Sequence, residues 1–479
     1  MYEFGNFIEG TWTPGQGKPF STCNPARPAE KVGAYSAASA EQVDGAVAAA
    51  ARAQTKWGVR PAVERGQELT RFVNALEEMS EQIAIAITRE QGKPLAESRG
   101  EVAKACGEAR FMIGEASRSH GTVMPSSRPG FSNMVTRRPR GVIAALSPWN
   151  FPIMTPMRKI MPALVFGNAV ILKPSEYAPA AACMVADAAK DFLPPGLLQI
   201  VLGMVEPGQA MVSHPGIDGI TFTGSAAVGK KIYGAAAQHL AEVSLELGGK
   251  NAAVIHDVND LDSCLDQIVS AAYQCAGQRC TGISRVVVDA GLKDRVVAGL
   301  VDRVGRIRVG DGMLDGVAMG PMTNAAQFEK VAQAVEAGVA EGARVSIGGH
   351  GIRVEQAEGG YFYAPTVLSE VTPVMSVARE EIFGPVLVVL SYSTLDEAFD
   401  ILNGVEYGLT SALFSNDQAV IQRFMRESQS GMLHVNHGTV PENHMPFGGI
   451  RNSGVGAYSV GPSAINFYTT EHAIYVKAQ

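Results

Sequence analysis

The chain has 479 residues, of which 46% are hydrophobic and 18% charged, so we expect a globular protein with more than one core. Its formal net charge of −7 argues against nucleic acid or an anionic membrane as a partner, because both repel an acidic surface. Neither a signal peptide nor an apolar run of about 18 residues is evident, so we expect a cytoplasmic protein with six reduced cysteines.

The N-terminal quarter is predicted to be mainly helical after strands and turns in residues 1–38. Ser39, followed three residues later by Gln42, predicts a capping box at the start of a helix that runs to about residue 57. Pro61 opens a second helical region to about residue 89, and a third helix covers about 95–115. Apolar side chains recur at three- and four-residue intervals, so these helices are expected to cover a core.

Residues 120–140 differ in character, with prolines, serines and an extended segment at 132–138. This pattern predicts a strand pair that reaches away from the helical body and pairs between subunits. The last residues, including 473–476, are predicted to form a strand that pairs with this arm or with another subunit.

Short apolar strands then alternate with helices, which predicts a parallel sheet covered on both faces. The strands are expected at 141–146, 169–172, 198–201 and 219–222, and the helices at 156–164, 180–192 and 226–240. A second alternation begins near 251–255 and runs to about residue 450. Two α/β units with a cleft between them fit this pattern, and ligands bind such sheets at the carboxyl ends of the strands.

Three residues have side chains suited to covalent catalysis. Cys280 precedes the β-branched run 286–288, so it is expected on a loop at the mouth of a sheet, where a thiol can act as a nucleophile. Asn150 follows a buried strand and can donate a hydrogen bond to an oxyanion, and Glu246 precedes a glycine pair and can act on a water. Each also has a structural interpretation, as a packed thiol, a turn residue and a helix end.

Two strand ends are candidates for holding a nucleotide. Gly224 and Ser225 form a strand-to-helix turn whose helix N-terminus could hold a phosphate, although the segment lacks the G-x-G-x-x-G pattern. Lys173 and Glu176 follow another strand and could bind ribose hydroxyls, or could form an exposed ion pair.

Seven short motifs, in the same order, resemble those of the NAD(P)-dependent aldehyde dehydrogenase superfamily, and the resemblance covers essentially the whole chain. They lie at 148–150, 173–176, 222–225, 246–250, 277–280, 381–385 and 446–449. The resemblance implies an α/β fold with a Rossmann-type cofactor domain (1–118 and 141–248), an α/β catalytic domain (249–455) and a β oligomerisation arm (119–140 and 456–479). It also implies a homodimer or homotetramer.

The resemblance implies that Cys280 attacks an aldehyde to give a thiohemiacetal and then a thioester, with Asn150 stabilising the oxyanion. Glu246 would activate the water that hydrolyses the thioester, which favours free acid over transfer to coenzyme A. Glu176 would favour NAD and leave NADP as a second choice. The expected cofactor-binding residues are Trp149, Lys173, Glu176, Gly224, Ser225, Gly248, Glu381 and Phe383.

The substrate stays open at this point. Arg158 occupies the position at which succinate-semialdehyde dehydrogenases resembling this chain carry a carboxylate-binding arginine, but Gln274 stands where those enzymes have a second arginine. The alternatives are an aromatic or aliphatic aldehyde with Arg158 in a structural ion pair, a coenzyme A-acylating semialdehyde dehydrogenase, or a non-catalytic protein on the same scaffold. The irregularly spaced His434, His437 and His444 do not predict a metal site.

Overall fold

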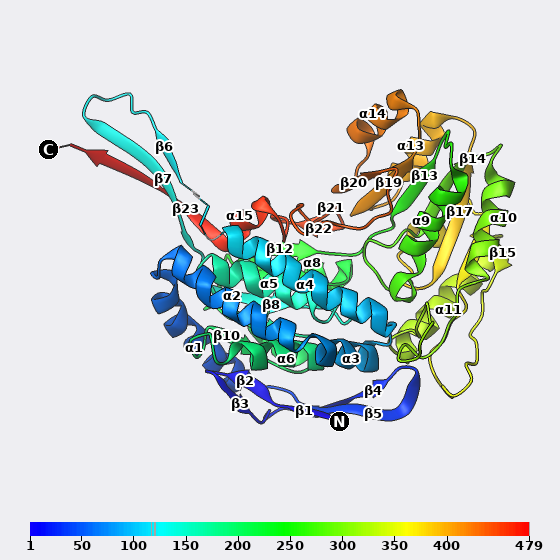
Figure 1. Cartoon of the computed structure of the whole chain (residues 1–479). Coiled ribbons are helices and arrows are strands. Elements are labelled where there is room, and N and C mark those ends of the chain that lie inside the picture. The colour runs from blue at the N-terminus through cyan, green and yellow to red at the C-terminus, as the bar shows by residue number, and fades with distance from the viewer. Residues whose placement is uncertain (116, 119–120, 479) are drawn as a thin grey trace.

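The computed structural model describes residues 1–115, 117–118 and 121–478 and contains two large sheets with helices on their faces (Figure 1). The predicted α/β architecture is confirmed. The first sheet has five parallel central strands and antiparallel edges, in the order β22 (Gly454–Val455), β12 (Glu242–Glu246), β11 (Gly219–Thr223), β8 (Val142–Leu146), β9 (Ala169–Lys173), β10 (Leu198–Ile200), β2 (Asn6–Ile8) and β3 (Thr11–Thr13).

The second sheet is parallel except for one edge strand. Its order is β15 (Arg344–Ile347), β16 (Thr366–Ser369), β17 (Val386–Tyr392), β14 (Arg285–Asp289), β13 (Ala252–Ile255), β19 (Thr410–Phe414) and β20 (Met432–Val435). Its helices are α9 (Leu261–Tyr273), α10 (Lys293–Val304), α11 (Ala325–Ala340), α12 (Ser376–Arg379), α13 (Leu395–Asn403) and α14 (Gln418–Glu427). One apolar core lies around each large sheet.

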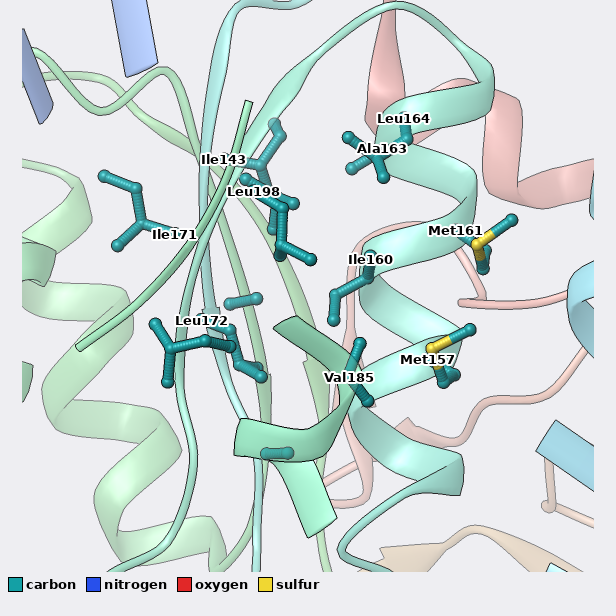
Figure 2. Packing of buried hydrophobic residues seen from close by; sticks show 14 of the residues in the cluster. Ile143, Met157, Ile160, Met161, Ala163, Leu164, Ile171, Leu172, Val185 and Leu198 are labelled. Carbon is teal, nitrogen blue, oxygen red and sulfur yellow. The ribbon is translucent and has the colours of Figure 1, made fainter. Parts of the chain in front are cut away.

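The helices of the first sheet pack in two groups, one formed by its first, seventh and eighth helices and the other by its second to sixth. They are α1 (Ala40–Gly58), α2 (Ala62–Glu78), α3 (Ser80–Gln91), α4 (Leu95–Glu115), α5 (Met154–Val165), α6 (Ala180–Ala189), α7 (Val205–Ser213), α8 (Ala226–Ala236) and the late helix α15 (Ile465–Tyr468). Helix α5 packs Ile160 toward Ile143, Leu172 and Leu198 of the sheet, whereas Met157 lies on the opposite side of the helix within the same apolar cluster (Figure 2). The buried Met157 therefore belongs to the core.

Local signals placed some of these boundaries correctly and missed others. The capping box of α1 is confirmed, since Ser39 accepts from Gln42 N and Gln42 reaches back to Ser39 N. The continuous helix expected over 61–89 is wrong, because the backbone leaves helical geometry at Met79 (φ −91°, ψ 4°) and divides it into α2 and α3. The helix expected to reach residue 240 ends four residues earlier, and Leu240 has a φ of 59° ahead of the unpredicted strand β12.

Three smaller sheets complete the described chain. The first joins β1 (Tyr2–Phe4), β5 (Arg27–Ser36) and β4 (Pro19–Asn24), and the second joins β18 (Tyr407–Gly408) and β21 (Ile450–Arg451). The third is the predicted arm, which projects from the body with the C-terminal strand (Figure 1): β23 (Thr469–Lys477), β7 (Phe131–Pro139) and β6 (Thr122–Met124). Residues 119–120 of that predicted segment lie outside the described residues.

Among the helices of the described ranges, none is both long and apolar enough to cross a lipid bilayer. The strand β22 is notable for its position: it follows the second sheet in the chain but pairs with β12 of the first, from Leu245↔Val455 to Glu246↔Gly454. The chain therefore passes between the two sheets twice.

Candidate active site

A cavity of about 530 Å³ lies where the carboxyl ends of β8, β11 and β12 face the loop that precedes β14. Asn150, Glu246 and Cys280 all line it. They are separated by 96 and 34 positions in the chain. Asn150 follows β8 and Glu246 ends β12, so both lie at the carboxyl edge of the first sheet, and Cys280 reaches them from the loop before β14 of the second sheet.

The loop that carries Cys280 has an unusual backbone. Cys275 and Ala276 have left-handed φ values of 55° and 53°, and Gly277 has a φ of 69°. A Cβ at Gly277 would collide with the carbonyl oxygen of Gly384, so only glycine fits there. Left-handed backbone at non-glycine residues costs about 1–3 kcal/mol each and persists only where surrounding contacts enforce it.

Those contacts come from the helical layer and from the loop itself. Glu97 accepts from the backbone N–H of Cys275 at 2.9 Å, and the side chain of Gln278 donates to the Cys275 carbonyl at 3.0 Å. At Cys280 itself, the side chain of Asn251 donates to the backbone carbonyl at 2.7 Å. The thiol is thus presented from a backbone that is fixed on both sides.

The surroundings of the Cys280 thiol favour its protonated form. Burial raises its pKa from the ordinary value of 9.0 to about 11, and the negative charge of Glu246 acts in the same direction. Arg279 and Arg158 oppose this, because their positive charges favour the thiolate. Formation of a Cys280 thiolate near neutral pH would therefore require a neighbouring base.

Asn150 presents an amide donor to the cavity. Its Nδ2 donates one hydrogen bond to the carbonyl of Gln278 at 2.9 Å, which leaves the second amide hydrogen for a ligand. The side chain is 4% exposed, so an oxyanion that it met would be shielded from water.

Glu246 offers one carboxylate oxygen that is already used and one that is not. Its Oε2 accepts from the hydroxyl of Thr223 at 3.1 Å. Its Oε1 is buried and accepts no hydrogen bond from the part of the chain that the structure describes. This oxygen can take a proton from a thiol or a water in the cavity.

The other end of the cavity is shaped for a flat, polar ligand. Trp149 and Phe383 meet edge to face with ring centroids 5.5 Å apart. Glu381 accepts from the backbone N–H of Gly249 at 3.0 Å, and a Cβ at Gly248 would strike its carboxylate. Backbone and carboxylate can therefore approach one ligand together.

A helix N-terminus borders the same end. Gly224 and Ser225 line the cavity at the start of α8, whose first turn is capped by Ser225 Oγ accepting from Val228 N at 3.4 Å. The partial positive charge of this terminus suits a phosphate group.

Comparison with known proteins identifies the scaffold. Residues 12–474 match the model of the aldehyde dehydrogenase family. The chain belongs to the aldehyde dehydrogenase family. It is 36% identical to the alpha-ketoglutaric semialdehyde dehydrogenase of Bacillus subtilis strain 168 over 476 residues, 98% of each chain.

Other relatives of this aldehyde dehydrogenase differ in substrate. It is 36% identical to the mitochondrial succinate-semialdehyde dehydrogenase of Arabidopsis thaliana, over 94% of this chain and 85% of that protein. The crystal structure of betaine aldehyde dehydrogenase from Staphylococcus aureus in complex with NAD+ superposes with a TM-score of 0.96 at 29% identity, over 99% and 94% of the two chains. One relative thus acts on an aldehyde with a carboxylate and another on an aldehyde with a cationic group.

Most of the residues predicted for the site of this aldehyde dehydrogenase share the cavity wall. They are Trp149, Asn150, Arg158, Gly224, Ser225, Glu246, Gly248, Cys280, Glu381 and Phe383. Lys173 and Glu176 lie outside this wall, at the carboxyl end of β9, with Lys173 Nζ 3.8 Å from the Glu176 carboxylate. Lys173 is buried, so the pair is not the exposed one considered above, and burial lowers the Lys173 pKa.

Arg158 is already paired in this structure. Its guanidinium donates to both oxygens of Glu108, at 3.0 and 2.6 Å, and lies 4.1 Å from the centroid of the Phe447 ring. Both side chains of the ion pair are buried, with 3% and 4% exposed. The geometry favours the structural alternative for Arg158 over a direct contact with substrate.

Sequence reasoning missed a polar stripe on α4. Glu97, Glu101 and Lys104 recur at four- and three-residue spacing and all line the cavity. That spacing places them on one helix face, so the stripe could have been recognised as a polar lining within an otherwise apolar layer. Arg279, next to Cys280, was also missed as a cavity residue.

His434, His437 and His444 do not belong to a candidate metal site in the described part of the chain. The rings of His434 and His437 stack with centroids 5.4 Å apart. Within the described ranges, no three or more histidine, cysteine, aspartate or glutamate side chains gather in a way that could hold a metal ion.

Proposed function

We propose that this aldehyde dehydrogenase oxidises an aldehyde with a distal carboxylate to the corresponding acid, with NAD as the cofactor and water as the acyl acceptor. The observation that carries the proposal is the convergence of Cys280, Asn150 and Glu246 on one cavity. A thiol, an oxyanion donor and a base together supply the chemistry of covalent aldehyde oxidation followed by hydrolysis.

The residues present fit a dinucleotide. Glu381, Gly248, Trp149 and Phe383 would hold the nicotinamide end, and the N-terminus of α8 would meet the pyrophosphate. Lys173 and Glu176 would bind the adenosine ribose, where the Glu176 carboxylate accepts from a 2′-hydroxyl and repels the 2′-phosphate of NADP. NAD, when bound, accepts the hydride from the aldehyde carbon. The solved relative in complex with NAD+ supports this choice.

The protein side chains account for the remaining steps. Glu246 takes the proton of Cys280, and the thiolate attacks the carbonyl carbon to form a thiohemiacetal. The Asn150 amide and the Cys280 backbone N–H stabilise its oxyanion. After oxidation to the thioester, Glu246 has released to solvent the proton that it took from Cys280. Its Oε1 then takes a proton from the attacking water and passes it to the departing thiolate, so that the acid and the free thiol are released.

The distal carboxylate would be met by Lys104 and Arg279. The acceptors of Arg279 are neutral: Gln274 Oε1, Thr281 Oγ1 and the carbonyl of Thr439. Burial lowers the pKa of Arg279, so an added carboxylate would stabilise its charge.

The surroundings of Lys104 also disfavour its positive charge. Burial lowers its pKa, and Arg158 and Arg279 act in the same direction against the opposing charge of Glu108. Its Nζ donates to the carbonyl of Pro441 at 2.8 Å and to Asn443 Oδ1 at 3.0 Å, both neutral acceptors. The carboxylate of Glu108 lies farther away, at 3.6 Å, and already receives two hydrogen bonds from Arg158. This cationic end distinguishes the cavity from one that accepts a cationic aldehyde, and the semialdehyde relatives are consistent with it.

The test compares succinate semialdehyde with butanal for the wild type and Lys104→Met. A charge-assisted hydrogen bond contributes about 1.5–3 kcal/mol, so kcat/KM should fall about 10- to 100-fold for the semialdehyde and less than about 3-fold for butanal. The matched control is Lys330→Met, since Lys330 lines the cavity beside Glu381 and its loss should affect both aldehydes equally. Equal losses with Lys104→Met would refute the substrate assignment.

The reaction class has its own test. Cys280→Ala should abolish oxidation while NAD binding, followed by quenching of tryptophan fluorescence, is retained. Product analysis should detect free acid without coenzyme A. A strict requirement for coenzyme A would favour the acylating alternative, and oxidation by Cys280→Ala would refute the assignment of the nucleophile.

We also propose the domain division stated above and a homodimer or homotetramer formed through the arm. The two separate cores support the division. The arm exposes apolar side chains that a second copy could cover, including Val123 at 81% and Tyr475 at 75% exposed. The six cysteines are free thiols in the structure, which supports a reducing, cytoplasmic location.

A further inference from the structure

A buried ion pair in the cavity wall has no part in the steps above. Lys93 Nζ lies 2.6 Å from the carboxylate of Glu101, and each side chain is 1% exposed. Removing two charges from water costs several kcal/mol per ion, which their mutual attraction offsets only with further hydrogen bonds. The partners in those further bonds indicate what the pair does.

The further bonds go to one short segment, 150–154. Lys93 donates to the backbone carbonyl of Asn150 at 2.7 Å, and its ammonium lies 4.0 Å from the centroid of the Phe151 ring. The free oxygen of Glu101 accepts from the backbone N–H groups of Ile153 and Met154, at 3.0 and 3.1 Å. The cation thus holds the segment by its carbonyl, and the anion holds the first amides of α5.

The same network also reaches the acceptor of the Asn150 side chain. That side chain donates to the carbonyl of Gln278, and Gln278 Oε1 accepts from Thr323 N at 2.9 Å. Thr323 in turn donates to the carbonyl of Gln91, whose side-chain oxygen accepts from Lys93 N at 3.0 Å. Both the backbone and the amide of Asn150 are therefore anchored to residues 91–101.

We propose that Lys93 and Glu101 are positioning residues that fix the orientation of the Asn150 amide toward the oxyanion. The inference rests on the proposed function, because it assigns a purpose to Asn150 in that reaction. Backbone anchoring is effective here because a shift of about 1 Å in a catalytic group can cost about 100-fold in rate. An apolar pair of similar volume could fill the space, but it could not hold a carbonyl and two amides at once.

The test measures kcat and KM for Lys93→Met and Glu101→Gln. Loss of one oxyanion donor typically lowers kcat about 100- to 1,000-fold, so displacement of that donor should lower kcat about 10- to 100-fold. The KM for the aldehyde and the affinity for NAD should stay within about 3-fold. The control is Arg99→Met, which removes a charge from the same helix where it pairs with the exposed Glu81; its kcat should match the wild type.

A double-mutant cycle separates positioning from general loss of structure. In an Asn150→Ala background, Lys93→Met should cost less than about 2-fold in kcat, because the donor it positions is already absent. Multiplicative losses in the double mutant would overturn the proposal, as would wild-type kcat in both single variants. If Lys93→Met does not fold, the same cycle with Glu101→Gln decides the question. Absence of aldehyde oxidation by the wild type would instead count against the proposed function.

Discussion

The pKa of Cys280 leads to a direct prediction about its reactivity. With a pKa of about 11, the thiolate fraction at pH 7 is on the order of 10⁻⁴, whereas a thiol with the ordinary pKa of 9.0 would have about 10⁻². Without cofactor, alkylation of Cys280 by iodoacetamide at pH 7 should therefore be roughly 100-fold slower than that of an ordinary thiol. The rate should rise about tenfold per pH unit from pH 7 to pH 10.

The assay is the rate of modification of the Cys280 peptide, followed by mass spectrometry across this pH range. Glu246→Gln is the informative variant, because the Glu246 carboxylate raises the Cys280 pKa. Removing that charge should lower the pKa and increase the rate at pH 8. A rate that levels off below pH 8 in the wild type would refute the reasoning, because it would show that Arg279 and Arg158 outweigh burial.

Three further predictions follow from the site. Gly277→Ala should destabilise the protein by several kcal/mol and abolish turnover, whereas Gly359→Ala, at a similar φ of +75° but with open space around it, should cost about 1 kcal/mol in thermal unfolding. Arg158→Met should lower the free energy of unfolding in urea by about 3 kcal/mol, because the buried Glu108 then keeps only the longer contact to Lys104 at 3.6 Å, and adding Glu108→Leu should restore most of it. Glu246→Gln should release about one NADH per active site rapidly and then turn over slowly, since hydrolysis of the thioester loses its base; a full steady-state rate would contradict that role.

The sequence indicated Asn150, Glu246 and Cys280, which line one cavity, because each lies in a short motif beside a strand or a glycine pair. Parallel strands bring such positions together without knowledge of the packing in between. The strand β12 was not predicted because its sequence, Glu-Val-Ser-Leu-Glu, is short and charged at both ends, and one of its two partners, β22, is far away in the chain. Its pairing in the sheet decides its conformation, and local propensity does not.

The residues on α4 and the role of Arg158 could not be derived in the same way. Lys93, just before α4, and Glu101, on α4, lie 187 and 179 positions before Cys280, and only tertiary packing turns them toward the cavity. Arg158 has the chemistry to bind a carboxylate, but which carboxylate it meets depends on how α4 packs against α5. A side chain's type indicates what it can bind, and its neighbours decide what it does bind.

The return of β22 to the first sheet has a mechanical consequence. Because the chain links the two bodies at 247–251 and again at 436–453, their covalent connection has two separate points. Two bodies that are connected at two points rotate most freely about the line that joins these points. Widening of the catalytic cavity for ligand exchange would then follow this axis, with Gly248 and Gly249 in one of the hinges.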